Sequence, residues 1–245
     1  MLQVMDEIEV QGLDVMSAGV TLAWATEAFA RGLITETETD GVTLAFGDAT
    51  GYIEAVQRIT TQPTDFYRAL ARGAEHAAAL YGGLDFALAF GGNEMPGYHT
   101  GPACHVGWLA GARHSHLDNA GYSLDQNAVK KGQTLTPEFV GETLVKEERW
   151  RQVLTSLVVC LFARGVYDRD TVLGALAATG FPWDASDLER LGAETLRRKT
   201  AFKQREGFDF GALRVPQRII DTPSPAGPFD EAFVREAIES YSNSL

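Results

Sequence analysis

The sequence predicts a mainly α-helical protein built from two helical lobes. Three observations support this prediction. Apolar side chains recur at helical spacing, capping residues and glycine stops bracket these segments, and extended apolar runs are few and short. The first lobe is predicted to span residues 1–130 and the second 131–245, and the two are expected to meet near a histidine-rich stretch at 101–125.

Composition narrows the class of protein. With 45% hydrophobic and 22% charged residues, the chain resembles an ordinary soluble globular protein. Its net charge of −12 argues against nucleic acid or an anionic membrane surface as a partner, because both need concentrated Lys and Arg. No apolar stretch suits a membrane span, and the acidic N-terminus is unlike a signal peptide. Two cysteines are too few for a disulfide framework, so a cytoplasmic location is expected.

In the first lobe the pattern predicts three helices, over 17–31, from Asp48 through Ile59, and over 64–81. Ser17 is the expected N-cap of the first helix, and Gly32 is its stop. Residues 39–41 form a predicted turn, and 42–46 are either a strand or merely extended.

In the second lobe, Thr136 and Pro137 mark a helix start. A further helix is predicted over 147–164 and, because 153–162 is apolar on every side, it should be buried all round. Three more helices are predicted over 169–179, 186–206 and 230–240, with a proline-rich extended segment at 213–229.

The stretch 101–125 concentrates groups that transfer protons or bind ligands. Four of the five histidines lie in it or just before it, together with one of the two cysteines: His99, Cys104, His105, His114 and His116. Its glycines and weak helical periodicity suit a hydrophobic core poorly. The sequence therefore predicts an ordered loop or pocket wall.

The residues alone leave the chemistry of this stretch open. His114 and His116 lack a third ligand at a usual spacing, so hydrogen-bonded loop histidines are a simpler interpretation than a zinc site. Asp118 or Asp125 could orient one imidazole. Cys104 is interpreted as an unreactive thiol, and Cys160, taken alone, as a core residue.

Several segments, in order, resemble motifs of the aldehyde ferredoxin oxidoreductase family of tungsten- or molybdenum-pterin enzymes. They are 9–19 (D-x-x-G-L-D and the helix after it), 30–35 (ERGLIT), 39–48 (DTDGLELRFGD), 94–98 (E-x-P-x-Y), 111–117 (S-x-R-G-x-x-H-L), 155–160 (D-x-x-G-L-C), 205–208 (REGF) and 215–218 (LPxR). The resemblance implies the helical domains 2 and 3 of that family, without its N-terminal pterin-sandwich domain.

The resemblance also implies roles for individual residues. The first motif would contact one pterin through Glu9, Gly12, Leu13 and Asp14, with Glu9 in place of the family's leading Asp. The second motif would contact the other pterin through Thr155, which replaces an Asp, and Val159; Cys160 would be the fourth ligand of a [4Fe-4S] cluster. His116 corresponds to the family's pocket histidine, and His114 is the alternative.

The implied function is oxidation of an aldehyde to a carboxylate, with electrons passed to ferredoxin or another iron-sulfur acceptor. A tungsten- or molybdenum-bis-pterin and the [4Fe-4S] cluster would be the cofactors. The family's other three cluster cysteines and a catalytic Glu have no counterpart here, so the chain is expected to be inactive alone and either to need an N-terminal partner polypeptide or to be a fragment. Two alternatives remain: a cofactor-free binding or assembly module derived from the family, and a different metal-dependent enzyme built around His114 and His116.

Overall fold

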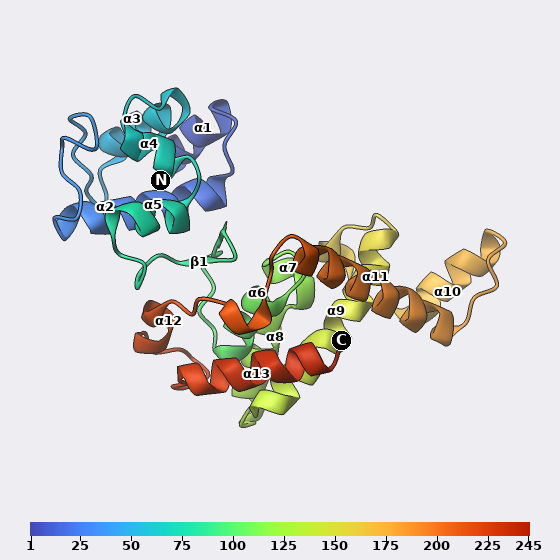
Figure 1. Cartoon of the computed structure of the whole chain (residues 1–245). Helices are drawn as coiled ribbons and strands as arrows, with labels where there is room; N and C mark the ends of the chain where they lie inside the picture. Colours follow the sequence, from blue (N-terminus) through green and yellow to red (C-terminus); the bar gives the residue numbers. More distant parts are fainter. The chain divides into compact units, whose positions relative to one another are not determined.

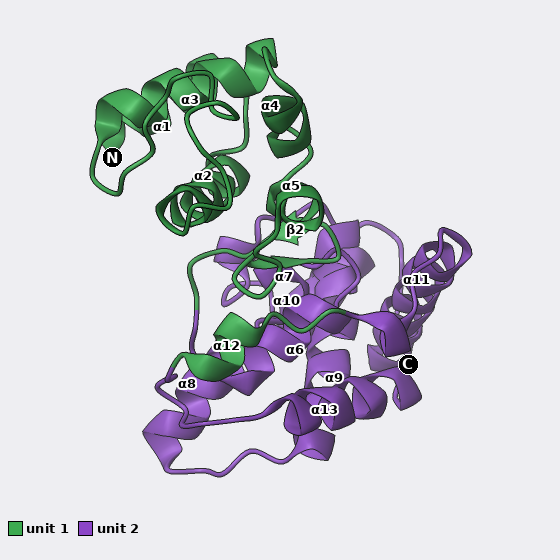
Figure 2. Ribbon diagram, turned by 60° about the vertical axis from the view of Figure 1, so that its left-hand side comes forward, with its two compact units in different colours: residues 1–98, 214–222 green, residues 99–213, 223–245 purple.

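The computed structural model describes residues 1–245 and confirms the mainly α-helical prediction (Figure 1). It contains thirteen α-helices, two 3-10 helices and one antiparallel pair of two-residue strands. The chain forms two compact units, one of residues 1–98 and 214–222 and one of residues 99–213 and 223–245 (Figure 2). The predicted boundary at 130/131 falls inside the second unit and stays a prediction about domain organisation. No helix has both the length and the apolar character needed to cross a membrane.

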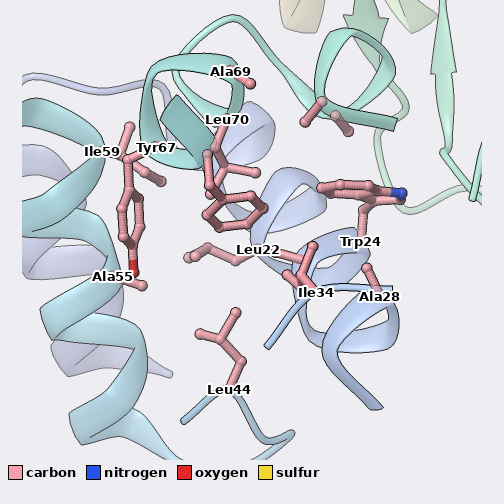
Figure 3. Close-up of a cluster of buried hydrophobic side chains, with 14 of the residues drawn as sticks. Leu22, Trp24, Ala28, Ile34, Leu44, Ala55, Ile59, Tyr67, Ala69 and Leu70 are labelled. Atoms are coloured by element: carbon pink, nitrogen blue, oxygen red, sulfur yellow. The ribbon is translucent and has the colours of Figure 1, made fainter. Parts of the chain in front are cut away.

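The first unit contains α1 (Leu2–Val10), α2 (Val15–Ala30), α3 (Ala49–Thr61), α4 (Asp65–Leu70), α5 (Ala74–Tyr81), β1 (Ala89–Phe90), β2 (Asn93–Glu94) and α12 (Gln217–Asp221). Its core gathers around α2, where Leu22 and Trp24 are buried against side chains of the neighbouring helices (Figure 3). Residues 42–46 form no strand, so the extended alternative is confirmed; Leu44 still reaches the core.

Two details of the first unit differ from the prediction. The N-cap of α2 is Asp14, whose carboxylate accepts the Ser17 N–H at 2.7 Å. Ser17, the predicted N-cap, therefore lies inside the first turn of the helix. The predicted helix over 64–81 is interrupted at Gly73, which has φ +97°. A Cβ at this position would lie 2.5 Å from Glu94 Oε1, so the break leaves space for that carboxylate.

The segment 214–222 is tied to the first unit by arginines. Arg214 donates to the main-chain oxygens of Leu84, Ala87 and Ala89 at 2.8–3.0 Å and pairs with Glu75 at 2.6 Å. Arg214, which is more than 120 residues further along the chain, therefore joins the segment 214–222 to the main chain leading into β1. The predicted proline-rich extended segment contains the short helix α12 at this point, which the sequence analysis did not anticipate.

The second unit contains α6 (Pro102–Ala110), α7 (His116–Asn119), α8 (Gly121–Lys131), α9 (Pro137–Ser156), η1 (Leu161–Ala163), α10 (Arg169–Ala178), α11 (Ala185–Arg205), η2 (Phe210–Ala212) and α13 (Glu231–Asn243). The predicted start at Thr136 is confirmed, and its side chain caps α9. The predictions for the regions of α10, α11 and α13 are also confirmed, apart from small shifts at their ends. In this unit α9 packs against both α11 and α13.

The interpretation of 101–125 as a loop is wrong. All nine residues of α6 are buried, and α7 and α8 occupy much of the remainder. The polar residues that made the stretch look unsuitable for a core instead bond inward to main-chain groups. Asp125 accepts the N–H groups of Ala103 and Cys104 at 3.0 and 2.9 Å, which satisfies free donors at the start of α6.

The predicted helix over 147–164 is also wrong. Helix α9 begins ten residues earlier and ends at Ser156, and the apolar segment after it is exposed or only partly buried. Val158 N donates to Thr155 O and Val159 N to Leu154 O, with Val158 at φ +58°. This is a Schellman motif, which ends a helix by reversing the hand of one residue.

We expect Gly192→Ala to lower the free energy of unfolding by about 2 kcal/mol. A Cβ on Gly192 of α11 would lie 2.3 Å from the main-chain oxygen of Arg149 on α9, and neither helix can yield locally. Chemical denaturation measures the effect. Gly174→Ala in α10 is the control, because its Cβ would meet open space; there the added methyl should stabilise by about 0.5 to 1 kcal/mol. Equal effects in the two variants would contradict the close approach of α9 and α11.

Candidate functional site

The first candidate site is a pocket of about 260 Å³ in the first unit. Leu13 and Asp14 of the D-x-x-G-L-D-like motif line it, at the point where the chain enters α2. Glu9 and Gly12 do not line it. Glu9 is exposed in the last turn of α1, and its main-chain oxygen accepts the Gly12 N–H at 3.0 Å. Of the four predicted pterin-contacting residues of this motif, only Leu13 and Asp14 therefore line the pocket.

Glu94 also lines this pocket, together with Arg72 and Gly73. Its Oε1 accepts the N–H of Ala74 at 2.9 Å, which satisfies a donor at the start of α5, and lies 3.5 Å from the Thr21 hydroxyl. The pocket thus offers carboxylate acceptors from Asp14 and Glu94 and one cationic side chain, Arg72. Such a set suits a small polar heterocycle that carries several N–H donors.

The second candidate site is the stretch of residues 112–119 in the second unit, called the histidine segment here because it contains His114 and His116. Asp118 is fully buried, and it accepts the main-chain N–H of Arg113 at 2.8 Å and of Ser115 at 3.1 Å. The Arg113 guanidinium approaches the same carboxylate at 2.7 Å. These bonds fold the segment tightly, with His114 at φ +55° and Ser115 as the N-cap of α7.

The two histidines of this segment differ in environment. His114 Nδ1 lies 2.7 Å from the main-chain oxygen of Trp108, which requires that nitrogen to carry a hydrogen. His116 is the first residue of α7, and burial lowers its pKa, with Arg151 and Arg113 acting in the same direction and Asp118 against them. His116 is therefore neutral near pH 7. Asp118 and Asp125 both accept main-chain N–H groups, and Asp118 also pairs with Arg113; a role for either carboxylate in orienting an imidazole stays a prediction.

Burial also shifts the pKa values of three other titratable groups of this unit, Cys104, Asp125 and His105. It raises the pKa of the Cys104 thiol to about 12, which agrees with the interpretation of this cysteine as unreactive. It raises the pKa of Asp125 to about 6, although hydrogen bonds from Cys104, Thr100 and Ala103 oppose the shift. His105, in contact with His99 at 2.9 Å, has its pKa lowered to about 3 and is neutral.

Lys203 is a candidate that the sequence analysis missed. Its Nζ donates to the main-chain oxygen of Gly111 at 2.9 Å and lies 3.7 Å from the centre of the Phe208 ring. The His114 ring is 5.6 Å from that of Phe208. Burial lowers the pKa of Lys203 to about 8. Phe208 belongs to the REGF-like segment, but nothing in the sequence connects Lys203 with the histidines.

Glu148 is a second missed residue. It is completely buried on α9 and accepts from Ala112 N at 2.8 Å, Asn119 Nδ2 at 3.0 Å and Tyr241 Oη at 2.7 Å. Burial, reinforced by the charge of Asp118, raises the pKa of Glu148. One turn away, Arg151 Nη1 donates to Leu117 O at 3.2 Å. Helix α9 therefore holds the histidine segment from two sides.

Cys160 follows the end of the same helix and is exposed, so its interpretation as a core residue is wrong. Its apolar neighbours Val158 and Phe162 are about nine-tenths exposed. Thr155 bonds back to Arg151 O at 2.7 Å, and Val159 is partly buried. Val158 occupies the position where the D-x-x-G-L-C motif has Gly, in a left-handed conformation that a β-branched residue adopts only with strain.

No group of three or more His, Cys, Asp or Glu side chains in the protein could together hold a metal ion. An exposed thiol at a helix end is accessible to a cluster, but it supplies one ligand of the four that a cubane requires. The residues present therefore fit a shared cluster and not a self-contained one. The acceptors of the Asp14 pocket likewise fit a pterin.

Known proteins similar to this chain are aldehyde ferredoxin oxidoreductases. A family model described as aldehyde ferredoxin oxidoreductase, domains 2 and 3, matches residues 1–243. A tungsten-containing aldehyde ferredoxin oxidoreductase of Thermococcus kodakarensis is 26% identical over 227 residues, which are 89% of this chain and 37% of the relative. A protein of Pyrococcus abyssi with the same name is 25% identical over 229 residues, with the same shares covered.

The chain therefore belongs to the aldehyde ferredoxin oxidoreductase family, and the resemblance seen in its motifs is confirmed. It spans just over a third of the length of the curated relatives it matches, and the match covers their domains 2 and 3.

We expect Val158→Gly to raise the free energy of unfolding by about 1 kcal/mol, because glycine adopts φ +58° without strain. The side chain is 91% exposed, so little packing is lost. Denaturant titration measures the change. Val166→Gly, at an exposed position without a positive φ, should destabilise instead. A loss of stability in both variants would show that Val158 is not strained.

Proposed function

We propose that this chain forms the helical part of a tungsten- or molybdenum-pterin aldehyde oxidoreductase, which oxidises an aldehyde to a carboxylate and passes electrons to ferredoxin or another iron-sulfur acceptor. The observation that carries the proposal is the exposed thiol of Cys160, at the end of a helix whose body holds the histidine segment. A structural cysteine would be buried; a cluster ligand must be reachable.

In this proposal Cys160 is the fourth ligand of a [4Fe-4S] cluster, and the other three thiolates come from outside these 245 residues. A partner polypeptide, or a further part of a longer chain, would provide them along with the remainder of the pterin site. Thr155 and Val159 would face one pterin. The complex would reside in the cytoplasm, where thiolates remain reduced.

Leu13 and Asp14 would hold the other pterin, with Glu94 and Arg72 as further polar partners in the same pocket. Glu9 and Gly12 would act only through the shape of the turn before α2. The bis-pterin metal centre supplies the redox chemistry when bound, while the protein supplies position and electrostatic field.

His116 is the proposed proton-transfer residue, and His114 the alternative. Because burial lowers the pKa of His116, its imidazole is neutral and able to accept a proton or to donate a hydrogen bond to an aldehyde oxygen. His114 Nδ1 is directed to Trp108 O, which leaves only Nε2 for a substrate.

Three substitutions favour a second candidate, a cofactor-free binding or assembly module. Glu9 and Thr155 replace acidic residues of the two pterin motifs, and Val158 replaces a glycine at the cluster motif. Thr155 lacks the carboxylate that the motif offers a pterin, Val158 strains the turn before Cys160, and Glu9 keeps its carboxylate on a longer side chain.

Metal content separates the two candidates. The chain is isolated anaerobically from its own host through an affinity tag, and iron, tungsten and molybdenum are measured per chain. We expect about four iron atoms with tungsten or molybdenum in the wild-type complex, and loss of iron in Cys160→Ser, because the cluster loses a ligand.

Cys104→Ser is the matched control, since Cys104 is buried and its thiol is held protonated. It should keep the full iron content. Iron that survives in Cys160→Ser would remove the ligand role, and a wild-type chain without iron, tungsten or molybdenum would establish the cofactor-free module.

The role of His116 is tested by aldehyde oxidation in the metal-loaded complex. His116→Gln should lower kcat by roughly a hundredfold or more, because general acid–base catalysis contributes that much. His76→Gln, in α5 of the first unit, is the control and should keep its activity. If His114→Gln were the impaired variant and His116→Gln active, the assignment would pass to His114.

A further inference from the structure

A second pocket, lined by basic residues, lies in the second unit and contains none of the site residues considered above. It is formed between α9, the start of α10 and α11, and has a volume of about 470 Å³. Four cationic side chains line it, with a single carboxylate, Glu189: Lys146, Arg149, Arg169 and Arg190. In a chain with 33 acidic and 21 basic residues, this concentration of positive charge is unexpected.

Three of these cations have no Asp or Glu side chain as a partner. Arg190 pairs with Asp187 at 2.5 Å, but Lys146, Arg149 and Arg169 form no ion pair with any Asp or Glu side chain. Like charges grouped around one cavity repel one another, so an anion placed among them is favoured.

Arg149 is held in a defined position. Gly192 of α11 lies close to the main chain of Arg149. The Nη2 atom of Arg149 donates to the main-chain oxygens of Ser244 and Leu245 at 2.6 and 3.2 Å. Its Nε is buried and has no hydrogen-bond acceptor. A buried donor without an acceptor costs free energy, so the Arg149 guanidinium has capacity for one further hydrogen bond.

The rest of the lining is apolar. Trp150 stands in the wall with the Arg169 guanidinium 4.9 Å from its ring centre, and Val153 and Leu188 are buried in a small hydrophobic cluster beneath. The volume is of the size that holds small organic ligands. A bare inorganic ion would fill little of it.

We propose that this basic pocket binds a small organic anion, in which a carboxylate or phosphate group is attached to a flat apolar body. The anionic group pairs with Lys146, Arg149 and Arg169, and the apolar body lies against Trp150 and the Val153–Leu188 floor. This site goes beyond the proposed oxidoreductase function, since it needs neither the pterin nor the cluster.

Isothermal titration of the purified chain with benzoate and with phenyl phosphate tests the proposal. We expect saturable binding of at least one of them, weakened by added salt and about tenfold weaker in Arg169→Gln, since one charge-assisted hydrogen bond is lost. The tighter of the two probes identifies the anionic group. Lys146→Gln provides a second variant if Arg169→Gln fails to fold, which circular dichroism detects.

Arg198→Gln is the matched control, because Arg198 is an 84% exposed arginine on α11 outside the pocket. Its affinity should equal that of the wild type. Equal weakening in Arg198→Gln, equal binding of neutral benzamide, equally tight binding of inorganic phosphate, or no saturable binding would each overturn the proposal. Because all arms use the metal-free chain, these outcomes are independent of the oxidoreductase assignment.

Discussion

The second unit depends on one buried carboxylate. Glu148 has no access to water, yet its three hydrogen bonds reach α13 through Tyr241 and both ends of the histidine segment through Ala112 and Asn119. Burying an ionisable group costs several kcal/mol unless its partners compensate. Three donors around one carboxyl provide that compensation, and they fix the relative positions of the elements that carry them.

Other features follow from this arrangement. With Ala112 and Asn119 fixed at either end, the intervening residues can turn sharply around Asp118, which places His114 in a left-handed conformation and His116 at the start of α7. Lys203 closes the same segment from α11 by bonding to Gly111 O. The histidines are thus positioned by bonds to a rigid frame of helices, which is what a proton-transfer group requires.

Sequence reasoning succeeded where the determining interaction is local. The caps at Asp48 and Thr136 act on N–H groups two or three residues away, so the starts of α3 and α9 were predictable. It failed at 101–125, because the partners of Asp125 lie more than twenty residues earlier and turn a polar sequence into a buried one. It failed again after Ser156, because a valine replaces the glycine that ordinarily marks a Schellman stop. Glu148 and Lys203 gave no signal in the sequence, since each bonds to a segment far from it along the chain.

The return of residues 214–222 to the first unit affects the order in which the protein is made. Arg214 bonds to the main chain around Leu84 and Ala89, so the first unit lacks part of its structure until most of the second has left the ribosome. Domains usually fold in sequence as they emerge. Here the N-terminal unit completes its folding late, because Arg218 of this segment places its guanidinium 5.8 Å from the ring centre of Phe86, which is buried in the finished protein. The chain passes between the two units three times, so no single cut divides it into two fragments that are each one complete unit.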